Sequence, residues 1–101
     1  MNVTVVPIPT SSRGLLANAP GWNETIVPQG AKISSHYHDF QAYYYTFGIS
    51  KMRTDQGDLS LPEAAMVVVP SGVVHGWIGP ESQAVAAVGH FHDGHGYHFV
   101  E

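Results

Sequence analysis

Cysteine is absent from the 101-residue chain, so the protein has neither a disulfide framework nor a thiolate metal site. Any metal that it binds must therefore be held by nitrogen and oxygen ligands. The same absence leaves the redox environment of the protein open.

Charged residues are also scarce, with 4 Lys and Arg against 8 Asp and Glu. The one close basic pair, Lys51 and Arg53, lies beside Asp55 and Asp58, so no basic stripe exists to neutralise phosphate groups. We therefore expect no nucleic-acid partner.

Long hydrophobic runs are missing too. The longest, "AAMVVVP" at residues 64–70, is far too short to span a bilayer. The N-terminus lacks a basic opening and is broken by Pro7 and Pro9, unlike a signal peptide. We expect a soluble, cytoplasmic protein without a membrane partner.

Helical periodicity is missing as well, although "SSRGLLANA" at residues 11–19 has room for one turn. Turn-forming residues instead separate short segments rich in Val, Ile, Tyr, Phe and Thr, which are typical of strands. The predicted strands lie within "WNETIVP" (22–28), "QAYYYTFGI" (41–49), "AAMVVVP" (64–70), "QAVAAVGHF" (83–91) and "YHFV" (97–100). Many short strands with no repeat and no break in composition predict one all-β domain, residues 1–101, built as a sandwich or barrel.

Two of the seven histidines, His36 and His38, are separated by a single residue. Side chains alternate between the two faces of a strand, so both imidazoles point the same way and are able to share a metal ion. A second segment, "VVVPSGVVHGW", adds a third candidate: Pro70 ends one strand, Gly72 permits a turn, and His75 opens the next strand.

The strand after the first histidine pair presents several polar and aromatic candidates. Gln41, Tyr43, Tyr45 and Phe47 share one of its faces, while Ala42, Tyr44 and Thr46 share the other. If the first face looks inward, Gln41 lies beside the two histidines. Tyr43 and Tyr45 are then either pocket residues or ordinary core aromatics whose hydroxyls need a buried partner.

Together the two segments resemble the motifs of the cupin superfamily. His36 and His38 match its H-x-H element, and Pro70, Gly72 and His75 match its P-x-G-x-x-H element. Gln41 stands near the place of the family's glutamate, and Ala64 and Gly79 replace the glycine and asparagine that bound the second motif.

The resemblance implies a cupin double-stranded β-helix, or jelly-roll barrel, with one divalent metal ion. The implied ligands are His36, His38 and His75, with Gln41 as a fourth through its side-chain oxygen. The alternative for Gln41 is a hydrogen bond to a ligand imidazole or to a metal-bound water. Nitrogen and oxygen ligands of this kind admit Fe, Mn, Ni, Co, Cu or Zn. Such a neutral ligand set leaves the ion its full charge, which favours an anionic small-molecule guest.

The C-terminal tail holds the remaining histidines, His90, His92, His95 and His98. "DG" at residues 93–94 predicts a two-residue hairpin that pairs His92 with His95 and His90 with Tyr97. That face is either a second metal site or a solvated or subunit-facing surface. His90 or His92 is a further alternative to Gln41 if this strand lines the barrel.

Two function classes follow from the resemblance. The first is a metal-dependent enzyme acting on a small apolar or aromatic substrate. Dioxygenase-like chemistry is favoured over cyclase or isomerase chemistry, because the inward positions assigned above contain no Asp or Glu to act as a base. The second is a non-catalytic small-ligand or sugar-sensing module, similar to the barrels of arabinose-type transcription regulators.

A homodimer is expected from the edges of the predicted sheets. The segments "MNVTVVPIP" (1–9) and "WNETIVP" (22–28) are apolar edge candidates with little charge to prevent pairing with another chain.

Overall fold

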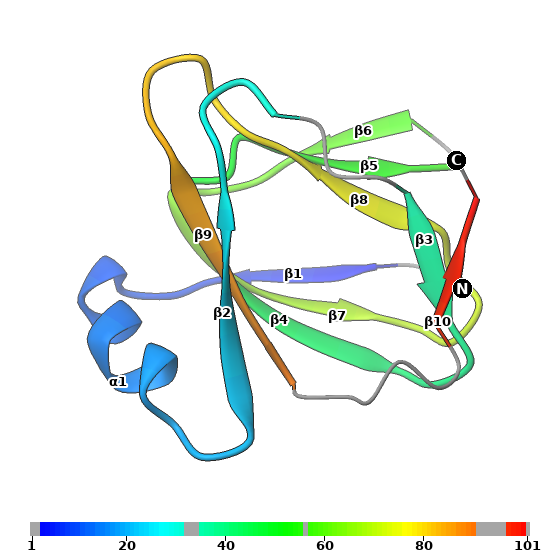
Figure 1. Ribbon diagram of the computed structural model, residues 1–101, viewed down its shortest axis with the longest axis horizontal. Coiled ribbons are helices and arrows are strands. Elements are labelled where there is room, and N and C mark those ends of the chain that lie inside the picture. Colours follow the sequence, from blue (N-terminus) through cyan, green and yellow to red (C-terminus); the bar gives the residue numbers. More distant parts are fainter. Residues whose placement is uncertain (1–2, 32–34, 56, 91–96, 101) are drawn as a thin grey trace.

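Ten strands form two five-stranded antiparallel sheets in the computed structural model, which describes residues 3–31, 35–55, 57–90 and 97–100 (Figure 1). Sheet A contains, in spatial order, β1 (Thr4–Pro7), β7 (Ala64–Val69), β4 (Ala42–Phe47), β9 (Val85–His90) and β2 (Trp22–Val27). Sheet B contains β10 (Tyr97–Phe99), β3 (His36–His38), β8 (His75–Ile78), β5 (Lys51–Thr54) and β6 (Gly57–Ser60). Apart from β5 and β6, neighbouring strands come from distant parts of the chain, as in an all-β jelly-roll barrel.

The main core lies between the two sheets. Val27, Met52 and Val67 come from three different strands and are completely buried there. The remaining buried members of this cluster are Ala42, Ile49, Ala65, Val69, Trp77, Val85 and Ala87. Apart from Ile49, which lies between β4 and β5, these are inward positions of strands, and their burial holds the two sheets together face to face.

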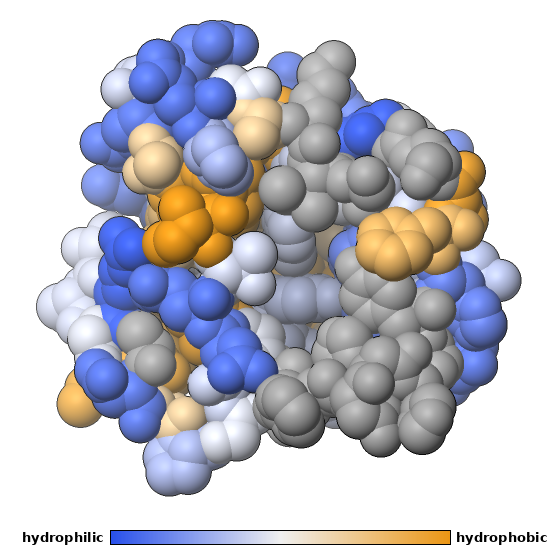
Figure 2. Space-filling model, in the orientation of Figure 1, coloured by the Kyte–Doolittle hydropathy of each residue, from blue (hydrophilic) through white to orange (hydrophobic). Residues whose placement is uncertain are grey.

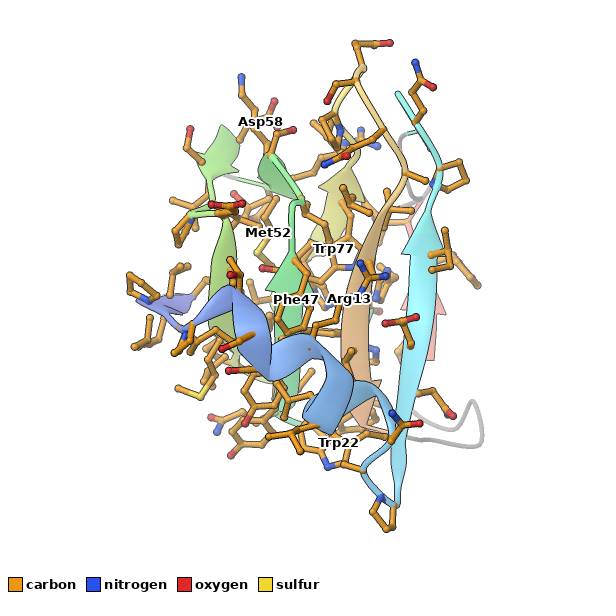
Figure 3. The ribbon with its side chains drawn as sticks, turned by 90° about the vertical axis from the view of Figure 1, so that its left-hand side faces the viewer. Arg13, Trp22, Phe47, Met52, Asp58 and Trp77 are labelled. Carbon is orange, nitrogen blue, oxygen red and sulfur yellow. The ribbon has the colours of Figure 1, made fainter. Side chains whose placement is uncertain are left out.

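A short helical segment covers part of the outer face of sheet A. It consists of the 3₁₀ turn η1 (Thr10–Ser12) and α1 (Arg13–Ala17), which confirms the helical turn expected within residues 11–19. Figure 3 shows α1 in front of the sheet, with Trp22 and Phe47 close to it. A second cluster forms here from Phe47, Ala64 and Val88, with Ile8, Leu16, Trp22 and Tyr45 packed against it. No helix in the described part of the chain is long and apolar enough to cross a membrane.

The orientation of β4 is opposite to the one considered from the sequence. Thr46 is completely buried, and Tyr44 packs against the main core, so these residues face inward. Tyr43 is 39% exposed, and Tyr45 joins the outer cluster beneath α1. Both faces of β4 carry aromatic residues because both are covered, and hydrophobicity therefore does not distinguish them.

The five predicted strand segments all contain observed strands. The hairpin of β5 and β6 was not predicted, because its segment is mainly polar and carries one completely buried side chain, Met52. The two predicted edge segments contain β1 and β2, which are the outer strands of sheet A. The homodimer itself stays a prediction, since the structure contains one chain.

The predicted C-terminal hairpin is wrong in its pairing. The strand β9 belongs to sheet A, where His90 is opposite Trp22, whereas β10 belongs to sheet B, where Tyr97 is opposite His38. The chain therefore passes from one sheet to the other between these strands. His92, His95 and the predicted turn at residues 93–94 lie outside the described residues.

The buried hydroxyl of Thr46 provides a test of the inward orientation of β4. Its Oγ1 has no hydrogen-bond partner among the described residues, so its burial costs desolvation energy without compensation. We expect Thr46→Val to raise the free energy of unfolding by about 1 kcal/mol, because valine has the same shape without the hydroxyl. Chemical denaturation measures this change.

Thr46→Ser is the matched control, because it keeps the hydroxyl and removes the methyl group. It should lower the free energy of unfolding by about 1 kcal/mol. A Thr46→Val variant that is less stable than the wild type would contradict the assignment.

Candidate metal centre

Three histidines from two adjacent strands of sheet B form a buried cluster. His36 lies directly opposite His75 across the pair of β3 and β8, and His38 lies two residues further along the same face. His36, His38 and His75 are 4%, 2% and 0% exposed. One ligand nitrogen from each lies within 4.8 Å of the other two, an arrangement that could hold a single metal ion.

The turn between β7 and β8 brings the two histidine segments together. Gly72 has φ +79°, a left-handed conformation that glycine adopts without strain, and Val73 N–H donates to the Pro70 carbonyl at 3.2 Å. Gly72 N–H also donates to the His38 carbonyl at 2.8 Å. The spacing of the P-x-G-x-x-H element thus has a local cause, because the turn is hydrogen-bonded to β3 and places His75 opposite His36.

Hydrogen bonds on both sides of the ring fix the tautomer of His75. Its Nδ1 lies 2.9 Å from the Val73 carbonyl, which only accepts, so Nδ1 carries the proton. Its Nε2 is then an acceptor, and the Tyr44 hydroxyl donates to it at 3.0 Å. A backbone carbonyl on one imidazole nitrogen is the usual way to orient the other nitrogen toward a metal.

Burial lowers the pKa of His75 from 6.5 to about 4. The largest cause is desolvation of the charged imidazolium, and His36 lowers the pKa further, while the hydrogen bond to Val73 opposes both effects. His75 is therefore neutral at physiological pH, as a metal ligand must be.

Aromatic side chains surround the cluster. Phe40 stacks on His38 with ring centroids 4.8 Å apart, and Phe99 lies 6.3 Å from His36. Trp77 follows His75 on the same face of β8 and meets the Tyr44 ring edge-on at 5.0 Å. Figure 2 shows that the face of the molecule drawn there is hollowed near its centre, with side chains of intermediate hydropathy inside the hollow.

The other predicted site residues, Gln41, Tyr43 and Tyr45, lie outside the histidine cluster. Gln41 is exposed, and its amide nitrogen donates to the Tyr43 hydroxyl at 2.6 Å. Tyr43 and Tyr45 belong to the outward face of β4, so neither contacts the cluster from inside the barrel. Tyr44 is the tyrosine that reaches the cluster, and it lies on the face of β4 opposite to the one that the sequence pattern suggested.

One of the tail histidines, His98, lies outside the cluster. It is exposed, its Nε2 lies 3.1 Å from both carboxylate oxygens of Asp39, and its ring stacks on Tyr37 at 4.8 Å.

The donor set fits a divalent transition metal. Imidazole nitrogens suit Fe, Ni, Cu and Zn, and the lone pair on His75 Nε2 is directed away from the backbone that holds its Nδ1. No carboxylate belongs to the cluster within the described residues. The fold and the site thus define an all-β jelly-roll barrel with three buried histidines that could hold a metal ion.

Comparison with solved structures gives the same fold. Salicylate 1,2-dioxygenase from Pseudaminobacter salicylatoxidans has a TM-score of 0.54 and 15% identity, over 80% of this chain and 31% of that enzyme. A variant of it in complex with gentisate has a TM-score of 0.54 and 13% identity, over 80% of this chain and 30% of the other. The chain therefore spans less than a third of these enzymes, and the likeness shows the fold alone. No protein-family model and no curated protein matches the sequence.

The depressed pKa of His75 makes the metal-free protein sensitive to acid. Below pH 6.5 the unfolded chain takes up a proton at this residue, whereas the folded chain does so only near pH 4. The free energy of unfolding should therefore fall by up to about 3 kcal/mol between pH 7 and pH 4, at 1.36 kcal/mol per pH unit. Denaturation in the presence of a chelator measures this slope.

His75→Gln should lose this part of the acid sensitivity, while His98→Gln, which changes an exposed histidine, should keep it. Equal slopes in the wild type and His75→Gln would show that the folded protein protonates His75 as easily as the unfolded chain does.

The resemblance implies that Gln41 ligates the metal, and two substitutions test this ligation. Because its side chain is exposed and bonded to Tyr43, we expect Gln41→Ala to leave the dissociation constant for Zn²⁺ within about threefold of the wild type. Direct ligation instead requires a loss of more than about tenfold in Gln41→Ala, and tighter binding in Gln41→Glu, whose carboxylate adds a negative charge. Competition with a chelator measures both constants.

Proposed function

We propose that the protein is a metal-dependent member of the cupin superfamily that acts on a small aromatic or anionic organic molecule by dioxygenase-like chemistry. The observation that carries the proposal is the cluster of His36, His38 and His75. These imidazoles are buried together, and the tautomer of His75 is set so that a nitrogen lone pair is offered. The jelly-roll fold and the named dioxygenases among its structural neighbours support the class.

The three histidines would hold the ion on the inner face of sheet B. A redox-active divalent ion such as iron supplies electrons for the activation of O₂ and an electrophilic centre for an anionic substrate. Because imidazoles are neutral, they leave the positive charge of the site uncompensated, and this favours a carboxylate or phenolate as its guest.

The surrounding side chains support binding of a ring-shaped apolar guest. Phe40, Trp77 and Phe99 supply aromatic surface around the histidines. Tyr44 adds a hydroxyl from the opposite sheet that is able to hydrogen-bond an oxygen atom. Salicylate and gentisate, the molecules named with the structural neighbours, combine a ring with a carboxylate and are suitable first probes.

The absence of a carboxylate from the described cluster supports oxygen chemistry over isomerisation. An isomerase or cyclase needs a positioned base to move a proton, and Asp and Glu are the usual choice. None of the described acidic residues belongs to the histidine cluster. The same absence also fits the alternative function, a non-catalytic barrel that binds a small ligand without turning it over.

Metal content tests the proposal directly. Untagged protein should bind about one divalent ion per chain, and His36→Ala, His38→Ala and His75→Ala should each weaken binding by at least about 100-fold, because β3 and β8 carry no further imidazole to replace the one removed. Elemental analysis and chelator competition measure stoichiometry and affinity.

His98→Ala is the matched control, because it removes an exposed histidine bonded to Asp39 and should leave binding unchanged. Full occupancy in all three cluster variants would exclude the centre. Iron-loaded protein should also consume O₂ with salicylate or gentisate in an oxygen-electrode assay. Metal binding without consumption of O₂ would favour the ligand-binding alternative.

A further inference from the structure

The tyrosine at the histidine cluster lies where a metal ion would bind. Tyr44 projects from β4 in sheet A, and its hydroxyl crosses to sheet B to donate to His75 Nε2 at 3.0 Å. Because His75 Nδ1 is bonded to the Val73 carbonyl, Nε2 is the nitrogen that remains to ligate metal. The hydroxyl and the ion therefore require the same lone pair.

The distances show that the Tyr44 hydroxyl and a metal ion cannot share the lone pair of His75 Nε2. A metal–imidazole bond is about 2.0–2.1 Å long, so an ion on this lone pair would lie within about 1 Å of a hydroxyl oxygen that is 3.0 Å from Nε2. Even the shortest metal–oxygen bonds are about 2 Å. Binding of the ion to His75 thus requires the Tyr44 hydroxyl to leave its present position.

Packing holds the Tyr44 ring where its hydroxyl reaches the histidine. Trp77 meets the ring edge-on at 5.0 Å, and the backbone of Gly89 lies opposite Tyr44 on β9. A Cβ at residue 89 would be 3.1 Å from two carbons of the ring, tighter than ordinary van der Waals contact. The glycine thus leaves room for the ring against the strand, and the hydrogen bond is formed without a change of the surrounding fold.

We propose that Tyr44 gates the metal centre by competing with the ion for His75 Nε2. In the metal-free protein the hydroxyl satisfies this nitrogen, and the free energy of that hydrogen bond is subtracted from the free energy of metal binding. The inference rests on the three-histidine centre proposed above. It assigns two roles to Tyr44: the hydroxyl lowers the metal affinity of the centre, and it supplies a hydrogen bond to His75 Nε2 when no metal is bound.

The substitution Tyr44→Phe tests the gate, because phenylalanine keeps the ring and removes only the hydroxyl. One lost neutral hydrogen bond corresponds to an affinity about 2- to 10-fold tighter for Zn²⁺, measured by chelator competition at a fixed pH. Tyr43→Phe and Tyr45→Phe remove hydroxyls from the outward face of the same strand, so both should leave the affinity unchanged. These two controls distinguish the effect of removing the hydroxyl at His75 from the effect of removing any tyrosine hydroxyl from β4.

Nitrogen NMR of the imidazoles reports the hydrogen bond without any metal. In the wild type the His75 Nε2 resonance should show an accepted hydrogen bond, and in Tyr44→Phe it should move toward the position of a free imine nitrogen. Addition of Zn²⁺ to the wild type should shift Nε2 to a metal-bound position and change the Tyr44 ring resonances together with it.

The outcomes separate the gate from the centre. If wild-type protein binds zinc through the three histidines and Tyr44→Phe binds it equally or less tightly, the gate is wrong and the centre stands. Weaker binding in Tyr44→Phe, with a tyrosinate charge-transfer band in ferric wild-type protein, would make Tyr44 a ligand instead. Failure of both proteins to bind metal would overturn the centre and the gate together.

Discussion

The hydrogen bond from His75 Nδ1–H to the Val73 carbonyl is the contact on which the organisation of the site depends. It selects one tautomer of a completely buried imidazole and directs the other nitrogen into the space between the sheets. It also partly offsets the desolvation that keeps this histidine neutral. Without a fixed acceptor for Nδ1, neither the Tyr44 hydroxyl nor a metal ion would find a defined partner on this ring.

Buried polar groups of this kind are costly to stability unless they are satisfied, and the barrel satisfies His75 from two directions. The turn of β7 and β8 supplies the backbone acceptor from one side, and sheet A supplies a tyrosine hydroxyl from the other. The site therefore depends on the closure of the two sheets over each other. Opening of the barrel would separate Tyr44 from His75 and would expose the cluster to water.

The chemistry proposed for the protein follows from the neutrality of this environment. Imidazole is a neutral ligand, so three histidines with aromatic rings around them would hold a divalent ion without a compensating charge from the described residues. An anionic ligand would neutralise part of the charge of the ion, and a ring-shaped ligand would pack against the aromatic side chains. The solved structures resemble this chain in fold alone, so the proposed chemistry rests on the residues of the cluster.

Sequence alone determined the fold class, most strands and the three candidate histidines. Strand alternation puts His36 and His38 on one face, and the Pro-Gly turn puts His75 at the spacing of the P-x-G-x-x-H element. Tertiary structure decided which tyrosine joins them. The strand β4 is covered on both faces, inside by sheet B and outside by the α1 segment. Its hydrophobic pattern therefore does not indicate which face points into the barrel. Similarly, the partner of β10 is β3 in the opposite sheet, although a local hairpin signal precedes it. Strand pairing between distant segments depends on how the whole core is filled, and no short stretch of sequence contains that information.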